Sequence, residues 1–190
     1  MDLKNYISYG SETQSYLSFG SALPPAGLVV PYNLTVPVNA QGRAQGIELA
    51  YQQAFGNFGI DVNYTYTDAK QTEGVPTTGP SAGDSRLVGA SKNVYNVSGY
   101  YENAHFSARV SYNYRSAFYS GLDRSTAFTQ DSIGTLAATL AWIFNENLSV
   151  NLDGQNLNNP TLKYYALDTT QPRAFYKNGR QYYLTLRARF

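Results

Sequence analysis

The feature that most constrains this chain is a strict alternation of apolar and polar residues at its C-terminal end. Tyr182, Leu184, Leu186, Ala188 and Phe190 form one set, and Tyr183, Thr185, Arg187 and Arg189 form the other. A period of two predicts a β-strand whose two faces meet different environments. About ten alternating residues are also the length that a tilted strand needs to cross a bilayer, with lipid on one face and water on the other.

The same alternation recurs along the chain. Residues 148–155 place Leu148, Val150 and Leu152 on one face, against Ser149, Asn151, Asp153 and Gln155 on the other. Comparable patterns predict strands over residues 2–9, 45–54, 58–67, 92–101, 106–116 and 135–144. With the C-terminal strand, eight strands are expected. No stretch shows the helical period, so the expected fold class is all-β, as a transmembrane antiparallel up-and-down β-barrel.

The connections between these strands alternate between short and long. Three short ones are flanked by apolar or aromatic residues: Phe55–Phe58, Tyr101–Phe106 and Phe144–Leu148. The long ones, at residues 10–43, 68–91, 117–132 and 156–180, are rich in Gly, Pro, Ser, Thr and Asn. Outer-membrane barrels have short periplasmic turns and long external loops. The pattern therefore predicts that the short turns are periplasmic and that the last strand ends on that side.

Composition excludes several classes of protein. The aromatic content of 15% suits interfacial girdles, whereas 14% charged residues and a formal net charge of +1 argue against a nucleic-acid partner. The absence of Cys excludes disulfides, thiolate metal sites and thiol nucleophiles. No run reaches the roughly 18 apolar residues of a transmembrane helix.

Several segments, taken in order, resemble the C-terminal part of the β-barrel of a TonB-dependent outer-membrane receptor. They are Gly46-Ile47-Glu48-Leu49, Asn63-Tyr64-Thr65-Tyr66-Thr67-Asp68-Ala69, Ser91-Lys92-Asn93-Val94-Tyr95-Asn96, Arg109-Val110-Ser111-Tyr112-Asn113-Tyr114-Arg115-Ser116, Gly154-Gln155-Asn156-Leu157-Asn158-Asn159 and Gly179-Arg180. Such receptors close a barrel of about 22 strands around an N-terminal plug, so eight strands would be its last third. The resemblance implies energised uptake of a scarce nutrient, such as a carbohydrate or an iron chelate, across the outer membrane of a Gram-negative bacterium.

The same resemblance implies particular partners. They are outer-membrane lipid, a small-molecule nutrient, and the plug and TonB system acting through residues missing from this sequence. The start, Met1-Asp2-Leu3-Lys4-Asn5-Tyr6, lacks the apolar core of a signal peptide. We therefore expect residues 1–190 to be a C-terminal barrel segment without its plug domain. Tyr182, Leu184, Leu186 and Phe190 resemble the signal that the barrel-assembly machinery reads, although Thr185 stands where that signal often has Gly.

Candidate chemical groups point to binding and not to catalysis. His105 lies in an expected turn without another His or Cys, which disfavours a metal site or a catalytic base, and no cofactor motif is present. We expect no enzymatic activity. Alternation places Arg109, Arg115, Arg187 and Arg189 on the water-facing side, where pairing with carboxylates or plug groups is the first interpretation and contact with an anionic ligand the second.

Aromatic residues of the long loops offer a second set of ligand contacts. They are Tyr16, Phe19, Tyr32, Phe118, Tyr119, Phe128, Tyr164, Tyr165, Phe175 and Tyr176. Such rings either stack on a sugar or an iron chelate, or serve as girdle and packing residues. As ligand-binding candidates the sequence favours Tyr119, Tyr165 and Arg115.

Two other classes of protein fit the alternation. One is a complete small eight-stranded outer-membrane protein with a structural or adhesion role. The other is a soluble ligand-binding barrel or sandwich, which would have an apolar interior and a polar exterior. The aromatic residues at the strand ends and the Arg residues on the polar face favour lipid outside.

Overall fold

The computed structural model describes residues 1–17, 27–77, 81–123 and 126–189. Strands and their connections make up this part of the chain, and no helix in it is long and apolar enough to cross a membrane. The strands are β1 (Asp2–Leu17), β2 (Val29–Phe55), β3 (Phe58–Glu73), β4 (Asn93–Glu102), β5 (Phe106–Arg115), β6 (Phe118–Asp123), β7 (Thr126–Gln130), β8 (Ile133–Asn145), β9 (Leu148–Gln155), β10 (Leu162–Ala166), β11 (Pro172–Tyr176) and β12 (Gln181–Ala188).

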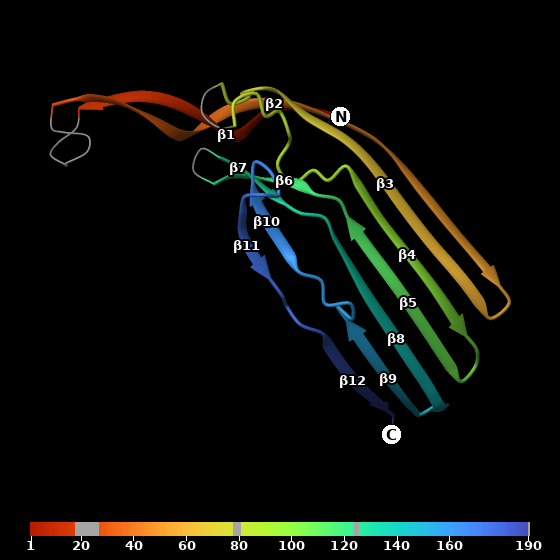
Figure 1. Ribbon diagram of the computed structural model, residues 1–190. Coiled ribbons are helices and arrows are strands. Elements are labelled where there is room, and N and C mark those ends of the chain that lie inside the picture. Colours follow the sequence, from red (N-terminus) through yellow and green to blue (C-terminus); the bar gives the residue numbers. More distant parts are fainter. Residues whose placement is uncertain (18–26, 78–80, 124–125, 190) are drawn as a thin grey trace.

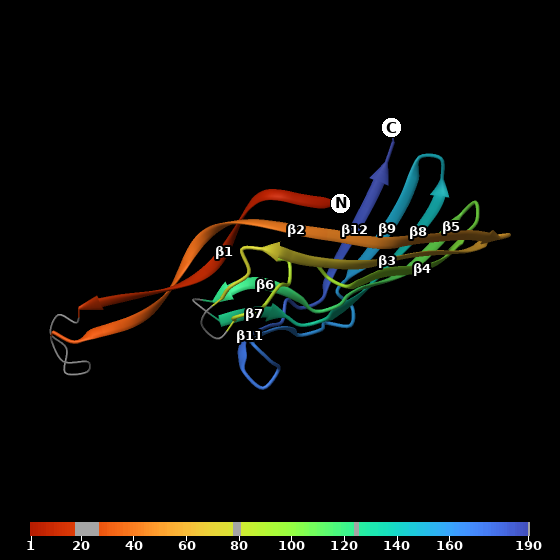
Figure 2. The same cartoon turned by 90° about the horizontal axis from the view of Figure 1, so that it is seen from above.

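The main body is an eight-stranded antiparallel sheet in the order β1-β2-β3-β4-β5-β8-β9-β12. All eight strands that the sequence predicts are present in this sheet. The short connections β2–β3, β4–β5 and β8–β9 lie together at one end, and the long connections lie at the other (Figure 1). The sheet curves but does not close, because β1 and β12 form its two edges (Figure 2). This is the geometry of a wall segment of a larger barrel.

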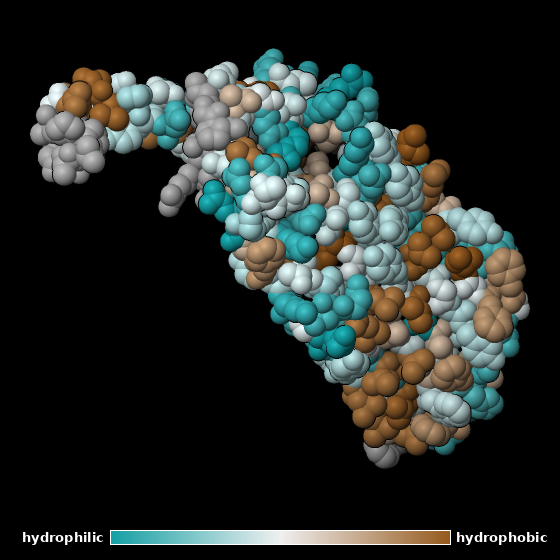
Figure 3. All heavy atoms as spheres, in the orientation of Figure 1, coloured by the Kyte–Doolittle hydropathy of each residue, from teal (hydrophilic) through white to brown (hydrophobic). Residues whose placement is uncertain are grey.

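Strand register places the predicted apolar residues on one continuous face. Residues that face each other across an antiparallel pair project to the same side of the sheet. One row consists of Leu184, Leu152 and Leu140, in neighbouring strands, and continues to Ala108 and Tyr101. Leu184 is 76% exposed and Leu152 is 42% exposed. Figure 3 shows hydrophobic residues gathered over the half of the molecule that carries the short turns.

Aromatic rings form a chain across this face at the short-turn end. Phe58 of β3 packs against Tyr101 of β4 with 4.9 Å between ring centroids, and Phe106 of β5 packs against Trp142 of β8 at 5.7 Å. Tyr101 and Phe106, 6.2 Å apart, join the two pairs. Amphipathic and aromatic rings gather where a bilayer meets water. The predicted belt at the short turns is therefore present as one continuous contact chain.

A second aromatic row crosses the same face nearer the long loops. Tyr64, Tyr95 and Tyr114 face one another on β3, β4 and β5, and the rings of Tyr95 and Tyr114 stack at 4.8 Å. Along β3, Phe58 and Tyr64 are six positions apart, which is about 20 Å of strand. Apolar residues such as Ile60 and Val62 fill the interval. Two aromatic rows bounding an apolar band match the surface of a transmembrane barrel.

The expected loops are wrong in two respects. The first long connection, expected over residues 10–43, is mostly strand: β1 continues to Leu17, and β2 begins at Val29 and runs for 27 residues. The connections over residues 117–132 and 156–180 also contain strands, which form a second sheet in the order β11-β10-β7-β6. These segments lack clean alternation because they do not separate lipid from water, so the pattern that finds membrane strands misses them.

The β1–β2 pair extends beyond the rest of the sheet. Pairing between β2 and β3 ends at Gln41 and Glu73, whereas β1 pairs with β2 up to Leu17 and Val29. Residues 9–17 and 29–37 therefore form a two-stranded arm, which projects away from the long-loop end in Figures 1 and 2. The nine residues of β2 in this arm correspond to a reach of about 30 Å.

Candidate functional site

The face opposite the apolar one carries a row of carboxamides. Asn63 of β3, Asn96 of β4 and Asn113 of β5 face one another in register, and Thr135 of β8 continues the row. The side-chain amide of Asn96 donates a hydrogen bond to the carbonyl oxygen of Asn113. Because each Asn both donates and accepts, such a row can bond along itself and to a ligand. The alternation that makes one face apolar thus makes the other a hydrogen-bonding wall.

An ion pair lies next to this row, toward the short-turn end of the sheet. Arg109 Nη1 of β5 donates to Asp61 Oδ2 of β3 at 2.7 Å and to Ser98 Oγ of β4 at 3.1 Å. The Arg109 guanidinium also lies 4.7 Å from the centroid of the Tyr100 ring. The sequence interpretation that Arg109 pairs with a carboxylate on the polar face is confirmed. Since the two charges face each other, they largely cancel.

Tyr100 is held over a glycine on the neighbouring strand. Gly59 faces Tyr100 across the β3–β4 pair, and a Cβ built on Gly59 would lie 2.2 Å from Tyr100 Cζ. Only glycine at this position leaves room for the Tyr100 ring to lie against the β3 backbone. In this position the ring packs against the Arg109 guanidinium. This part of the wall is therefore fixed before any ligand arrives.

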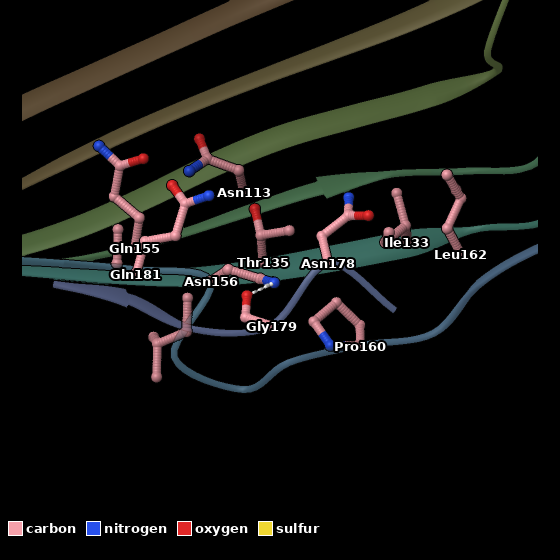
Figure 4. Close-up of a pocket in the computed structure, with 12 residues that line it drawn as sticks. Asn113, Ile133, Thr135, Gln155, Asn156, Pro160, Leu162, Asn178, Gly179 and Gln181 are labelled. Carbon is pink, nitrogen blue, oxygen red and sulfur yellow. Dashed lines mark hydrogen bonds between the residues drawn. The ribbon is translucent and has the colours of Figure 1, made fainter. Parts of the chain in front are cut away.

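Two cavities open on the polar face, one on each side of the Asn96–Asn113 bond. The larger, about 510 Å³, is lined by Gln52, Asp61, Asn63, Asn96, Ser98, Arg109 and Ser111, among others. The second, about 470 Å³, lies nearer the long loops, and its polar lining consists of Asn113, Thr135, Gln155, Asn156, Asn178 and Gln181. In Figure 4 the labelled side chains of Asn113, Thr135, Gln155 and Asn178 project to the same side of the sheet.

The segment after β9 forms the floor of the second cavity. Asn156 and Asn159 adopt positive φ angles of 56° and 46°, a region that Asn tolerates better than most residues. Asn158 bridges to β8, because its Oδ1 accepts from the Leu136 N–H at 2.9 Å and its Nδ2 donates to the Gly134 carbonyl at 2.8 Å. Asn156 donates to the Gly179 carbonyl (Figure 4). The asparagine-rich motif thus positions the cavity as well as lining it.

The long connections β3–β4, β5–β8 and β9–β12 pack against one another at the long-loop end of the sheet. The Gly89 N–H donates to the Tyr119 carbonyl at 2.8 Å, and Arg86 Nη1 donates to Thr129 Oγ1 at 3.2 Å. β7 and β10 pair directly, from Gln130 and Tyr164 to Phe128 and Ala166. Several of the most buried side chains of the described chain lie here: Ala127, Thr129 and Ala166 are at most 2% exposed. These connections form a packed unit, which we term the loop cluster (residues 84–91, 118–123, 126–130 and 162–176).

Arg86 is the charged centre of the loop cluster. It binds the Asp84 carboxylate through Nε at 2.9 Å and Nη2 at 2.6 Å, and its guanidinium lies 5.2 Å from the Tyr119 ring centroid. Burial opposes ionisation of Asp84, but the hydrogen bonds and charge of Arg86 prevail and lower the pKa of Asp84. The same hydrogen bonds raise the pKa of Arg86. Burial raises the pKa of Tyr119 to about 12, so its hydroxyl stays protonated in any physiological medium.

The three predicted ligand residues lie in or beside the loop cluster. Tyr119 and Tyr165 both line a cavity of about 310 Å³ next to Arg86, and Tyr119 is only 7% exposed. Arg115, at the end of β5, donates to Ser91 Oγ and to the Gly89 carbonyl, and its guanidinium lies 3.8 Å from the Phe118 ring centroid. The structure therefore gathers the three residues in one region, with packing contacts for Tyr119 and Arg115.

The assembly-signal candidates of β12 and the single His are exposed. Tyr182, Leu184 and Leu186 lie on β12 and are 63%, 76% and 66% exposed, whereas Phe19 and Phe190 lie outside the described residues. His105 is exposed in the β4–β5 turn, where its N–H donates to Asn103 Oδ1 at 2.9 Å. Within the described chain, no group of three His, Cys, Asp or Glu side chains is placed to hold a metal ion.

Sequence reasoning missed Arg86 and the Asn63–Asn96–Asn113 row. Arg86 lies in a connection without periodicity, so nothing in the pattern distinguishes it from other surface charges. The three Asn residues could have been found, because each occupies a polar position of an expected strand and the short turns set the register between neighbouring strands.

We expect Arg86→Met to loosen the loop cluster, because it leaves the partly buried Asp84 carboxylate without its partner and removes the bond to Thr129. Amide hydrogen exchange over residues 84–91 and 126–130 should accelerate. Low pH should act in the same direction. The pKa of Asp84 is depressed below its ordinary value of 3.8, so the stabilisation is present above that value and is lost as pH falls through the lower folded-state pKa. Unchanged exchange in the variant would contradict a locking role.

A curved antiparallel wall with an apolar face between two aromatic rows, a hydrogen-bonding face and a packed loop cluster defines a segment of a large transmembrane β-barrel. Residues 1–157 match the model of a protein family described as "TonB dependent receptor-like, beta-barrel". The chain therefore belongs to this family. The family consists of receptors of the Gram-negative outer membrane and is not a family of enzymes. This assignment decides against the soluble ligand-binding barrel.

Comparison with solved structures agrees on the fold. The crystal structure of the siderophore receptor PirA from Acinetobacter baumannii superimposes with a TM-score of 0.60 at 17% sequence identity. The match covers 100% of this chain and 28% of PirA, so the chain spans less than a third of that receptor's length. A search of curated proteins gave no significant match. The predicted fold class, an antiparallel barrel segment of this family, is confirmed.

Proposed function

We propose that this chain is the C-terminal barrel segment of an outer-membrane receptor that imports a scarce nutrient, such as a carbohydrate or an iron chelate, by an energised TonB-dependent route. Family membership over residues 1–157 supports the receptor class. The observation that carries the proposal is that one face is built for lipid while the other bears cavities beneath the loop cluster. PirA is a siderophore receptor, which makes iron chelates one ligand class to test.

The proposal assigns a role to each region. The apolar face contacts outer-membrane lipid, and the polar face lines a lumen that a plug domain occupies and releases through the TonB system. Ligand first meets the loop cluster, where Tyr165 lines a cavity and Arg115 ends the wall. Tyr182, Leu184 and Leu186, exposed on the edge strand β12, are proposed with Phe190 as the signal for the barrel-assembly machinery.

The test compares the two ends of the wall in cells that carry the full-length receptor. Tyr165→Ala, Arg115→Ala and Tyr119→Phe should lower uptake more than Asn57→Ala and Asn145→Ala in the short turns, because ligand binds at the long-loop side. Uptake of radiolabelled oligosaccharides and ferric chelates is measured at matched surface levels, with and without TonB. The reverse order would contradict the orientation, and uptake that does not depend on TonB would contradict the energised route.

A further inference from the structure

The polar lining of the two wall cavities consists largely of uncharged side chains. We define the carboxamide belt as the residues Asn63, Asn96, Asn113, Thr135, Gln155, Asn156, Asn178 and Gln181. Register joins its members: Asn63, Asn96, Asn113 and Thr135 face one another across β3, β4, β5 and β8. Gln155 faces Gln181 across β9 and β12. The belt therefore crosses six strands of the wall at the level just below the loop cluster.

No charged side chain of the described chain lines the cavity nearer the loops. In the other cavity the charges are Asp61 and Arg109, which form an ion pair of 2.7 Å through Asp61 Oδ2. In the loop cluster, Arg86 is bound to Asp84 at 2.6 Å. Next to the loop cluster, Lys70 lies 3.7 Å from Asp68, and Lys92 lies over the Tyr66 ring at 5.7 Å. A bound anion would need an unpaired cation, and Arg109 and Arg86, the arginines at these cavities, are both already paired with carboxylates.

Carboxamides suit a different ligand chemistry. Each Asn or Gln offers two N–H donors and a carbonyl acceptor, which together match a hydroxyl group that donates and accepts. The two cavities, about 470 and 510 Å³, share the Asn96–Asn113 bond as a boundary and have the size of ordinary ligand sites. A ligand that presents many hydroxyls and no charge would form hydrogen bonds with the carboxamide belt and would not place an unpaired charge in the cavities.

We propose that the carboxamide belt recognises an uncharged, hydroxyl-rich ligand of the oligosaccharide class as it passes the wall. The inference rests on the proposed receptor function and narrows its ligand class. Asn113 and Gln155 are its main contacts, because both line the cavity nearer the loops and project to the same side of the sheet (Figure 4). The alternative role of the belt is purely structural, as a seat for the plug.

The experiment uses the full-length receptor in the outer membrane with matched surface levels. The probes are radiolabelled maltohexaose, cellohexaose and xylohexaose in one arm, and ferric citrate and ferric enterobactin in the other. We expect receptor-dependent uptake in the oligosaccharide arm. Asn113→Leu and Gln155→Leu should each raise the KM for uptake roughly 2- to 10-fold, the effect of removing one neutral hydrogen-bonding side chain. Asn113→Gln should recover part of the loss.

The matched control is Asn151→Leu, on the same polar face but toward the short turns, where Asn151 faces Thr185 and Ala141. It should leave the KM unchanged. Vancomycin sensitivity reports whether the plug still seals the barrel. If both belt variants admit vancomycin and lower uptake of every probe alike, the belt seats the plug and the proposal fails. Receptor-dependent uptake of ferric chelates alone would overturn the ligand class and leave the receptor function standing. Uptake in neither arm would overturn both.

Discussion

Val150→Arg should destabilise the assembled barrel by about 1 kcal/mol, because the cost of a cation on the lipid face is about 2–4 kcal/mol at the bilayer midplane and falls to about 0–1 kcal/mol near the interface, where Val150 faces Trp142 of the aromatic row. Val150 lies between Leu186 of β12 and Trp142 of β8, and both neighbours belong to the apolar face. The new guanidinium would lie among apolar neighbours on the lipid face. Urea unfolding of the full-length barrel in phospholipid vesicles measures the effect.

Asn151→Arg is the control for this substitution, because it places the same side chain one residue further along β9. Asn151 lies between Thr185 and Ala141 on the polar face, where an added cation stays in contact with water. We expect its cost to be well under that of Val150→Arg. Equal costs, or the reverse order, would mean that the two faces of the wall are assigned the wrong way round.

Gly46→Val should disrupt the pairing of β2 with β3. A Cβ on Gly46 would lie 2.2 Å from the Tyr66 carbonyl oxygen and 3.3 Å from Thr67 Cα, and both atoms belong to the backbone. Backbone atoms in a paired strand cannot move aside without breaking the ladder. We expect a loss of at least about 1–3 kcal/mol, the usual cost of overpacking, and a lower yield of folded barrel. Heat modifiability on gels and urea unfolding in vesicles report the two effects.

Gly99→Ala is the matched control, because Gly99 is also a strand glycine of the same sheet but has open space around it. A Cβ on Gly99 would have the Gly59 carbonyl oxygen as its nearest heavy atom, at 4.0 Å. This substitution should be nearly neutral. If both variants fold equally well, contact with the Tyr66 carbonyl does not constrain the wall.

The sequence predicts the membrane-facing part of the fold well, because alternation directly reflects the two solvents. Leu148, Val150 and Leu152 share a face in the structure as the pattern predicts, and turns such as Phe55–Phe58 fix the register of the strands they join. The arm and the second sheet could not be predicted in this way. Their strands do not separate lipid from water, and the pairing of β7 with β10 joins connections that lie more than 30 residues apart.

The candidate site was predicted only in part. Tyr119, Tyr165 and Arg115 do lie in one region, but their mutual placement depends on contacts with residues 84–91 that no local pattern encodes. Aromatic residues are uncommon in most loops, so their presence there indicates a specific role. Asn is common in turns, so a single Asn indicates little. A row of Asn residues becomes visible only when the strand register is known.

The projecting β1–β2 arm divides the chain into parts of different local stability. Over residues 29–37, β2 has β1 as its hydrogen-bonding neighbour and receives no support from β3, and a two-stranded ribbon alone is only marginally stable. The arm also contains Pro31 and Pro37, which donate no backbone hydrogen bond. Opening of the arm therefore leaves the pairing of β2 with β3 intact, and its amides should exchange with solvent without global unfolding. A melting temperature from global unfolding would therefore report the stability of the eight-stranded sheet and not that of the arm.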